Sequence, residues 1–215
     1  MTETRLLRGL AAAALGGLAA CAPQGFDRPG LIAGASEDDA DALRSADRHI
    51  LVVRHARKIA PDCNAMDCQL SLRGDAMVER LGGLIGGPVD FAFSSAACRT
   101  QLTAEAGRIP VVPHQAVDEL AAGCAKGETV SRRRSEAFAE ARLSDSRWGL
   151  VAEHSNTSCL WIEEFAGPSG AAEAGCVEGR LPDGAYGDIY WLYRIDGAWQ
   201  VSVLPGAFDI DADAP

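Results

Sequence analysis

Residues 50–55 read ILVVRH, and this stretch decides the fold class. Four consecutive apolar residues, three of them β-branched, are typical of a strand that is buried on both faces of a sheet. The run ends on Arg54 and His55, two side chains that bind anions well. Because open α/β sheets bind ligands outside the carboxyl ends of their strands, the stretch predicts a buried strand that delivers a basic pair to a ligand site.

The rest of the chain alternates between strand-like and helix-like segments. Further strands are predicted at 91–93, 111–112 and 149–152, and helices at 72–85, 99–106, 130–143 and 158–165. A glycine-rich loop at 166–188 and a hairpin at 189–204, turning at Asp196-Gly197, complete the pattern. This order predicts an α/β fold, with a layered, mostly parallel sheet and helices on both faces.

The first twenty residues predict an export signal. Arg5 and Arg8 precede an apolar stretch over 9–19, which is shorter than the about 20 residues of a membrane-spanning helix. Residues 18–21, LAAC, resemble the lipobox of bacterial lipoproteins. That resemblance implies cleavage before Cys21 and acyl chains on this cysteine, which would anchor the protein in the cell envelope, facing the periplasm. Ala22 at the next position fits sorting to the outer membrane in that family. The alternative is an ordinary secretory signal, or an N-terminal helix, with Cys21 incidental.

The remaining organisation is simple. Residues 21–48 are rich in Pro, Gly and Ala and then acidic, which predicts a solvated tether. A single domain is expected over 49–215, without repeats. The chain of 215 residues is 47% hydrophobic and 23% charged, values that allow a sizeable core.

The net charge of −10 limits the partners of this chain. Removing residues 1–20 would make it −11, because two arginines and one glutamate are lost. Such an acidic protein is a poor binder of nucleic acid. It would also repel anionic substrates unless a local basic site captures them.

Six cysteines remain after Cys21, an even number that predicts disulfides in an exported chain. Their spacing along the chain favours the pairs Cys63–Cys68, Cys98–Cys124 and Cys159–Cys176, although other pairings stay open. A zinc site is the competing interpretation. No CxxC or HxxxH spacing supports it, so no metal is expected.

Three predicted strands deliver polar side chains to one edge of the sheet. The first delivers Arg54 and His55, the second Arg99 one helical turn beyond its end, and the last His154. Guanidinium groups match phosphate oxygens bidentately, and an imidazolium would add a charged donor. The set therefore predicts an anion site.

Four motifs, in order, resemble the histidine phosphatase superfamily, which includes phosphoglycerate mutases and acid phosphatases. They are LVVRHA at 51–56, LSLRG at 70–74, SSAACRTQLTA at 94–104 and VAEHSNT at 151–157. The segment 181–190 is also similar, so the resemblance covers about residues 49–204. It implies a phosphoglycerate mutase-like fold.

The resemblance implies roles for the residues of the anion site. His55 would be the nucleophile that forms a phosphohistidine, and Arg54, Arg99 and His154 would hold the phosphoryl oxygens. Neighbouring positive charge should lower the pKa of His55, leaving it neutral and nucleophilic near neutral pH. The cationic group would also stabilise charge on the transferring phosphoryl group, so no cofactor is expected.

The leaving group needs a proton, which a carboxyl group would supply. Residues 117–123, VDELAAG, are similar to the segment that carries the acid in the mutase branch. This makes Glu119 the candidate donor, with Asp118 as its rival.

Two positions depart from the family pattern. Glu153 stands where relatives often have Gly; it is harmless if its side chain points away from His154, but repels phosphate or acts as the acid if it faces inward. Arg57 stands where relatives often carry Glu, and Arg57-Lys58 would either attract anionic substrates or lie in solvent.

The sequence thus predicts a lipid-anchored phosphomonoester hydrolase acting on a small phosphorylated substrate. The alternative is a catalytically impaired lipoprotein that still binds phosphate or a phosphorylated ligand. A structural envelope lipoprotein is a third interpretation. The residues do not indicate which substrate is used.

Overall fold

The computed structural model describes residues 28–115 and 121–210. Three predicted functional residues, Cys21, Asp118 and Glu119, lie outside the described residues.

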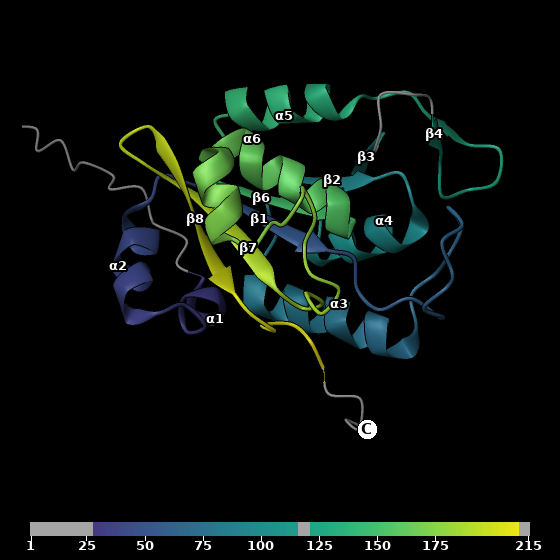
Figure 1. Cartoon of the computed structure of the whole chain (residues 1–215), viewed down its shortest axis with the longest axis horizontal. Coiled ribbons are helices and arrows are strands. Elements are labelled where there is room, and N and C mark those ends of the chain that lie inside the picture. Colours follow the sequence, from purple (N-terminus) through teal and green to yellow (C-terminus); the bar gives the residue numbers. More distant parts are fainter. Residues whose placement is uncertain (1–27, 116–120, 211–215) are drawn as a thin grey trace, which may run out of the picture.

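A six-stranded sheet forms the centre of the domain (Figure 1). Its strands, in spatial order, are β3 (Val112–His114), β2 (Phe91–Ser95), β6 (Trp148–Glu153), β1 (Arg48–Arg54), β7 (Ile189–Ile195) and β8 (Ala198–Leu204). The first four are parallel, whereas β7 runs antiparallel to β1 and β8 antiparallel to β7. The strands β4 (Ala121–Ala122) and β5 (Thr129–Val130) pair separately. The predicted mostly parallel sheet is confirmed, with the predicted hairpin as its antiparallel edge.

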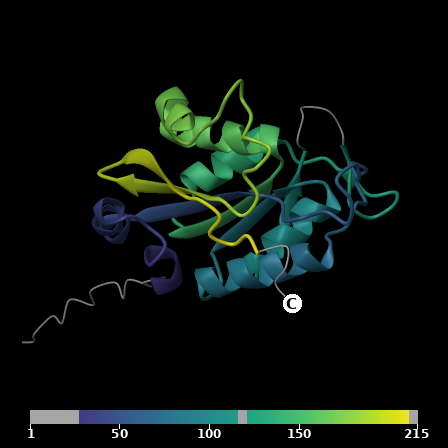
Figure 2. The ribbon, with the colours of Figure 1, turned by 60° about the horizontal axis from the view of Figure 1, so that its bottom comes forward.

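Helices cover both faces of the sheet, as Figures 1 and 2 show from two sides. They are α1 (Pro29–Ile32), α2 (Glu37–Ser45), α3 (Leu72–Ile85), α4 (Cys98–Ala104), the short 3₁₀ helix η1 (Glu105–Gly107), α5 (Arg134–Leu143) and α6 (Ser155–Glu173). The helices α1 to α4 contribute to one core, and α5 and α6 contribute to the other. The predicted helix over 130–143 begins later, because residues 129–130 belong to β5.

Strand β1 is buried on both faces, as its composition predicts. Leu51 and Val53 belong to the core that contains α3, whereas Ile50 and Val52 belong to the core that contains α6. Alternate side chains of a strand point to opposite faces, so one run of apolar residues serves both layers. The strand is therefore a rigid support for the residues at its end.

The predicted solvated tether is wrong for residues 28–48. Leu31 of α1 and Leu43 of α2 are buried in the core. The guanidinium group of Arg28 donates to the carbonyl of Ile85 at 2.6 Å, at the end of α3. Glu37, Asp38 and Asp41 are exposed, and these acidic residues concealed the packing in the sequence. Ser36 caps the helix by accepting from the backbone N–H of Asp39.

The predicted loop over 166–188 is wrong in its first part, because α6 continues to Glu173. Gly167 has a φ of +73° and interrupts the helix, and Pro168 follows at once. Proline suits the first turn of a helix, so the chain resumes the helix after a kink instead of leaving it.

Three disulfides are present, and they are the pairs that the spacing favours: Cys63–Cys68, Cys98–Cys124 and Cys159–Cys176. Each closes a segment near the carboxyl edge of the sheet. Within residues 28–115 and 121–210, no helix is long and apolar enough to cross a bilayer.

Candidate active site

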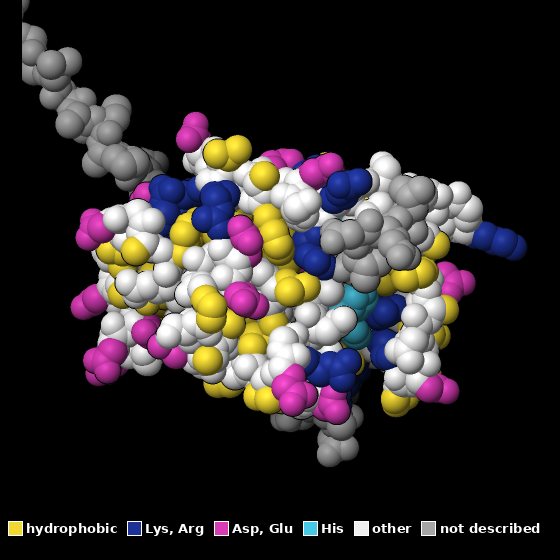
Figure 3. Space-filling model, turned by 45° about the horizontal axis from the view of Figure 1, so that its top comes forward, with side chains coloured by type: hydrophobic (Ala, Val, Ile, Leu, Met, Phe, Trp, Pro, Cys, Tyr) yellow, Lys and Arg dark blue, Asp and Glu magenta, His cyan; other side chains and the backbone are white. Residues whose placement is uncertain are grey.

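The ends of β1, β2 and β6 meet at one edge of the sheet. Arg54 of β1 pairs in register with Glu153 of β6, and the N–H of His55 donates to the carbonyl of Glu153 at 2.8 Å. The rings of His55 and His154 consequently lie 5.4 Å apart, centroid to centroid, with their planes at 71°. Figure 3 shows histidine side chains beside lysine and arginine side chains on this part of the surface.

The orientation of His55 leaves one ring nitrogen free to attack. Its Nδ1 lies 2.9 Å from the carbonyl oxygen of Ala56, and a carbonyl can only accept, so Nδ1 carries the hydrogen. The N–H of Ala56 in turn donates to Oγ1 of Thr103 at 2.9 Å, which fixes this turn of the chain. Nε2 therefore holds the lone pair and accepts no hydrogen bond from any described residue.

Burial is the main reason why His55 is neutral. The ring is 5% exposed, and burial, followed by the charges of His154, Arg99 and Arg54, lowers its pKa to about 2, against a raising effect from the Ala56 carbonyl. The sequence predicted the direction correctly but attributed it to like charge alone. A neutral imidazole at this position is a competent nucleophile across the physiological pH range.

The two arginines lie next to His55 without a carboxylate partner among the described residues. Arg99 is buried and donates to the carbonyl of Ala65 at 2.8 Å. Arg54 donates to the carbonyl of Asp183 at 3.0 Å and to the hydroxyl of Tyr186 at 3.1 Å. Since all these acceptors are neutral, the positive charge of both guanidinium groups remains available for an anion.

His154 supplies a neutral ring in the free protein. Burial lowers its pKa to about 4, and the charges of Arg99, Arg54 and Lys58 act in the same direction, whereas Glu153 raises it. The expected imidazolium is therefore absent near neutral pH, because the site is more deeply buried than the sequence revealed. The charge of the anion site comes from its arginines.

Glu153 points away from the anion site. Its fully buried carboxylate accepts hydrogen bonds from Ser95, from Thr157 at 2.6 Å and from Trp161 at 2.8 Å, and it lies 2.8 Å from Nε2 of His114. Burial alone would raise the pKa of Glu153, but His114 and these hydrogen bonds lower it to about 2. Glu153 thus neither faces the phosphate site nor serves as the proton donor.

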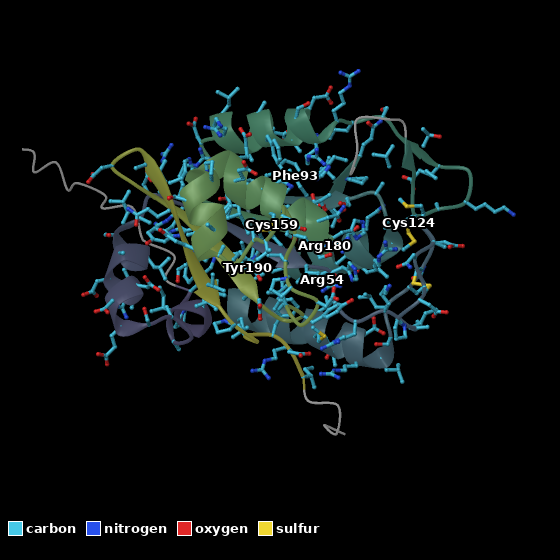
Figure 4. All side chains as sticks on the ribbon, viewed as in Figure 1. Arg54, Phe93, Cys124, Cys159, Arg180 and Tyr190 are labelled. Carbon is cyan, nitrogen blue, oxygen red and sulfur yellow. A yellow bond between two sulfur atoms is a disulfide. The ribbon has the colours of Figure 1, made fainter. Side chains whose placement is uncertain are left out.

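A cavity of about 510 Å³ opens beside the anion site. Its lining residues are Arg54, Arg57, Lys58, Pro61, Asn64, Ser155, Arg180, Asp183 and Tyr186. Figure 4 labels Arg54 and Arg180, which lie at this cavity on different segments of the chain. Arg57 and Lys58 line the cavity, which favours the interpretation that they meet anionic substrates.

The glycine of the LSLRG motif has a steric role. A Cβ on Gly74 would lie 2.2 Å from the carbonyl oxygen of Arg57. The same carbonyl accepts from the backbone N–H of Ser71 at 2.9 Å. The start of α3 therefore packs directly on the segment that follows His55, and only glycine permits this approach.

Three residues of the site carried no role in the sequence analysis. Arg180 and Tyr186 come from the segment after α6. The similarity of residues 181–190 to the family gave a signal for Tyr186, whereas nothing in the sequence marked Arg180. His114 lies at the end of β3, and nothing in the sequence marked it as the partner of Glu153. No described group of three or more His, Cys, Asp or Glu side chains could hold a metal ion.

Residues 50–158, about half of the chain, match the family model of the histidine phosphatase superfamily, branch 1. The chain belongs to this superfamily. Among solved structures, the chain is similar to that of the open reading frame Rv3214 from Mycobacterium tuberculosis, with 20% identity over 74% of this chain and 97% of that one and a TM-score of 0.52. A structure assigned as the phosphohistidine phosphatase SixA from Agrobacterium tumefaciens shares 22% identity over 73% of this chain and 97% of that one, with a TM-score of 0.48. At these identities the likeness concerns the fold. No curated protein sequence matches the chain.

Proposed function

We propose that this protein is a phosphatase that hydrolyses phosphomonoesters through a phosphohistidine on Nε2 of His55. The observation that carries the proposal is the fixed, neutral His55 ring, with Nδ1 hydrogen-bonded to the Ala56 carbonyl and Arg99 and Arg54 close enough to lower its pKa. Membership of the histidine phosphatase superfamily supports the proposal.

The reaction has two displacements at phosphorus. In the first, the Nε2 lone pair forms the N–P bond while the ester P–O bond breaks, and the leaving oxygen takes a proton. In the second, water attacks phosphorus and gives a proton to the carboxylate that protonated the leaving oxygen, while the N–P bond breaks and its electron pair returns to Nε2; inorganic phosphate is released. Arg54 and Arg99 hold the equatorial oxygens and stabilise the charge that spreads over them. Glu119, with Asp118 as its rival, stays the predicted proton donor.

The test compares three versions of the chain from residue 22 onward with p-nitrophenyl phosphate as substrate. We expect the unaltered chain to turn over and His55→Ala to lose at least about 10³-fold in kcat/KM, because the nucleophile is gone. Arg44→Gln is the control: it removes an exposed cation of α2 whose ion pair with Asp41 is worth little. Intact mass after an acid-free quench should show one added phosphoryl group only where His55 is present.

Two outcomes oppose the proposal. Undiminished hydrolysis by His55→Ala would remove His55 from the mechanism. Binding of phosphate without hydrolysis by the unaltered chain would support the alternative, a phosphate-binding lipoprotein without turnover.

We also propose that Cys21 carries a lipid that holds the domain at the outer membrane, facing the periplasm. The support is the order of basic residues, apolar stretch and LAAC box in residues 1–21. In a bacterial host, the full chain should incorporate labelled palmitate and sediment with membranes, and Cys21→Ser should do neither. Equal labelling of the two versions would refute the anchor.

A further inference from the structure

Beyond the anion site, the cavity presents a second group of cations. We name Arg57, Lys58 and Arg180 the pocket mouth. All three line the cavity of about 510 Å³, together with the polar side chains of Asn64 and Ser155 and one carboxylate residue, Asp183. In a chain with a net charge of −10, three adjacent cations beside a fourth at Arg54 are an unusual local concentration of positive charge.

Tyr186 separates the pocket mouth from the anion site. Its ring centroid lies 3.9 Å from the guanidinium carbon of Arg54, at the end of β1, and 4.1 Å from that of Arg57, three residues further along the chain. The same ring meets His55 edge-on at 5.8 Å. Two positive groups are thus held apart by one aromatic ring, on which both stack. The ring therefore lies between one cation of the anion site, Arg54, and one cation of the pocket mouth, Arg57.

The cations of the pocket mouth keep unused binding capacity. Arg180 has no side-chain hydrogen bond or ion pair among the described residues and is exposed. The ammonium group of Lys58 donates to the Pro61 carbonyl at 2.7 Å and to the Asn64 amide oxygen at 2.9 Å, so one of its three donors is free. Neither residue forms a salt bridge to a described carboxylate.

Arg57 is partly compensated. It lies 3.3 Å from Asp209, and that carboxylate also binds Arg73 at 3.1 Å. One negative charge therefore serves two guanidinium groups, and a net positive charge remains beside the cavity.

Both segments that carry the pocket mouth are fixed by covalent links. The Cys63–Cys68 disulfide closes the loop after Lys58, and the Cys159–Cys176 disulfide ties the segment that carries Arg180 to α6. Val177 and Arg180 also exchange two backbone hydrogen bonds, at 2.9 and 3.0 Å. The cations are presented on an ordered frame, which reduces the entropy lost when a ligand binds.

Resting on the phosphatase function proposed above, we infer that the substrate is a small doubly phosphorylated molecule. One phosphate group occupies the anion site and is transferred to His55. The second stays at the pocket mouth, held by Lys58 and Arg180 with Arg57 behind them. The binding energy of this non-reacting phosphate orients the ester at His55. It therefore raises kcat/KM and does not merely strengthen the binding of product.

The experiment uses glucose 1,6-bisphosphate and glucose 6-phosphate as probes that differ by one phosphate. We expect the unaltered chain to prefer the bisphosphate by at least about tenfold in kcat/KM, equivalent to about 1.4 kcal/mol. The double variant Lys58→Gln/Arg180→Gln should reduce that ratio to within about threefold. Arg44→Gln, which removes a distant exposed cation, should leave the ratio unchanged. Raising the salt concentration should lower the ratio in the unaltered chain, because charge at the pocket mouth is partly exposed.

The outcomes separate the two proposals. If p-nitrophenyl phosphate is hydrolysed but the two glucose phosphates react equally, or if the ratio survives in the double variant, the second subsite is refuted and the phosphatase function stands. If nothing is hydrolysed, the phosphatase function fails. Calorimetric titration of His55→Ala then decides the subsite by itself, since equal affinity for the two probes would refute it without any turnover.

Discussion

Glu153→Gln tests whether the carboxylate behind the anion site is a structural charge. The side chain is completely buried, lies 2.8 Å from Nε2 of His114 and accepts from Trp161 at 2.8 Å through the same oxygen, Oε1. Ser95 and Thr157 donate to the other oxygen, Oε2. Glutamine can keep its carbonyl on the Oε1 side, while the hydroxyl groups turn to accept from its amide. The substitution thus removes the charge with little change in shape.

The size of the effect follows from the pKa of Glu153. Folding lowers that pKa from its ordinary value of 4.5 to about 2, which corresponds to about 3 kcal/mol in favour of the carboxylate. Leaving a buried hydrogen-bonding group without its partner costs about 1–3 kcal/mol, which is of the same order. We therefore expect the variant to lose about 3 kcal/mol in the free energy of unfolding at neutral pH, or about 6–12 °C in melting temperature.

Denaturant unfolding of the chain from residue 22 onward measures this loss, with Glu164→Gln as the matched control. Glu164 pairs with Arg142 at 2.7 Å on the surface, so its replacement should cost less than about 1 kcal/mol. The pH dependence gives a second test. A carboxylate with a lowered pKa stabilises the fold above pH 4.5, and that contribution disappears as the pH falls toward about 2. The variant should lack this part of the acid destabilisation. A loss below 1 kcal/mol, or parallel stability curves for both chains between these pH values, would refute the reasoning.

Three further predictions concern the active-site edge. Gly74→Ala should lower the free energy of unfolding by at least about 2 kcal/mol, because the added Cβ would lie 2.2 Å from a backbone carbonyl oxygen. Gly83→Ala, in the same helix but with open space around it, should raise that free energy by up to about 1 kcal/mol, and thermal melts of the two variants compare them directly. The kcat/KM for p-nitrophenyl phosphate, corrected for the substrate's own ionisation, should stay flat between about pH 8 and pH 5 because the pKa of His55 is lowered to about 2; a decline centred near pH 6.5 would contradict a neutral, buried nucleophile. Replacing both Cys159 and Cys176 with Ser opens a loop with a sequence separation of 17 and should cost about 3 kcal/mol relative to the oxidised unaltered chain, measured by denaturant unfolding under oxidising conditions; stability equal to that of the oxidised unaltered chain would exclude the bond as a stabilising link.

The sheet was predictable because its strands are buried on both faces. The run at 50–53 and the shorter runs around residues 92 and 151 are apolar in consecutive positions, and such runs have few other structures available in a globular chain. The sequence did not predict the helices α1 and α2, because in such short segments the prediction depends on composition and intrinsic propensity. Here the composition is typical of a tether. Leu31 and Leu43 are the large side chains that mark their buried sides, with the small Ala40 beside Leu43, among acidic residues and glycines that also occur in tethers. The sequence did not predict the second part of α6, because a glycine-proline pair ordinarily ends a helix. In the structure the helix resumes after this pair and packs on the core.

The structure brings together the predicted site residues that directly follow strand ends, whereas the sequence did not reveal the residues that reach the site from loops. The motifs fix Arg54, His55 and His154 at neighbouring strand ends, and the register of β1 with β6 then determines their distances. Arg180 and Tyr186 reach the cavity through a segment whose course depends on a disulfide and on a kinked helix. The partner of Glu153 depends on the face of the sheet to which this last residue of β6 points. A shift of one residue in the strand register would turn its side chain to the opposite face.

The distribution of charge explains how so acidic a protein can receive phosphate. Glu153 lies one residue from His154 but behind the sheet edge, where His114 and three hydrogen-bond donors hold it away from the pocket. Asp209 lies on the outer side, between Arg57 and Arg73. Glu153 is thus bound by donors outside the pocket, and Asp209 compensates part of the charge of Arg57. Arg54 and Lys58 are bound only by carbonyl, hydroxyl and amide oxygens of described residues, and Asp183 is the carboxylate residue among the described lining of the cavity. Four cations and one carboxylate residue therefore line the cavity although the whole chain is negative, and the inferred preference for a doubly phosphorylated substrate depends on this local excess of positive charge.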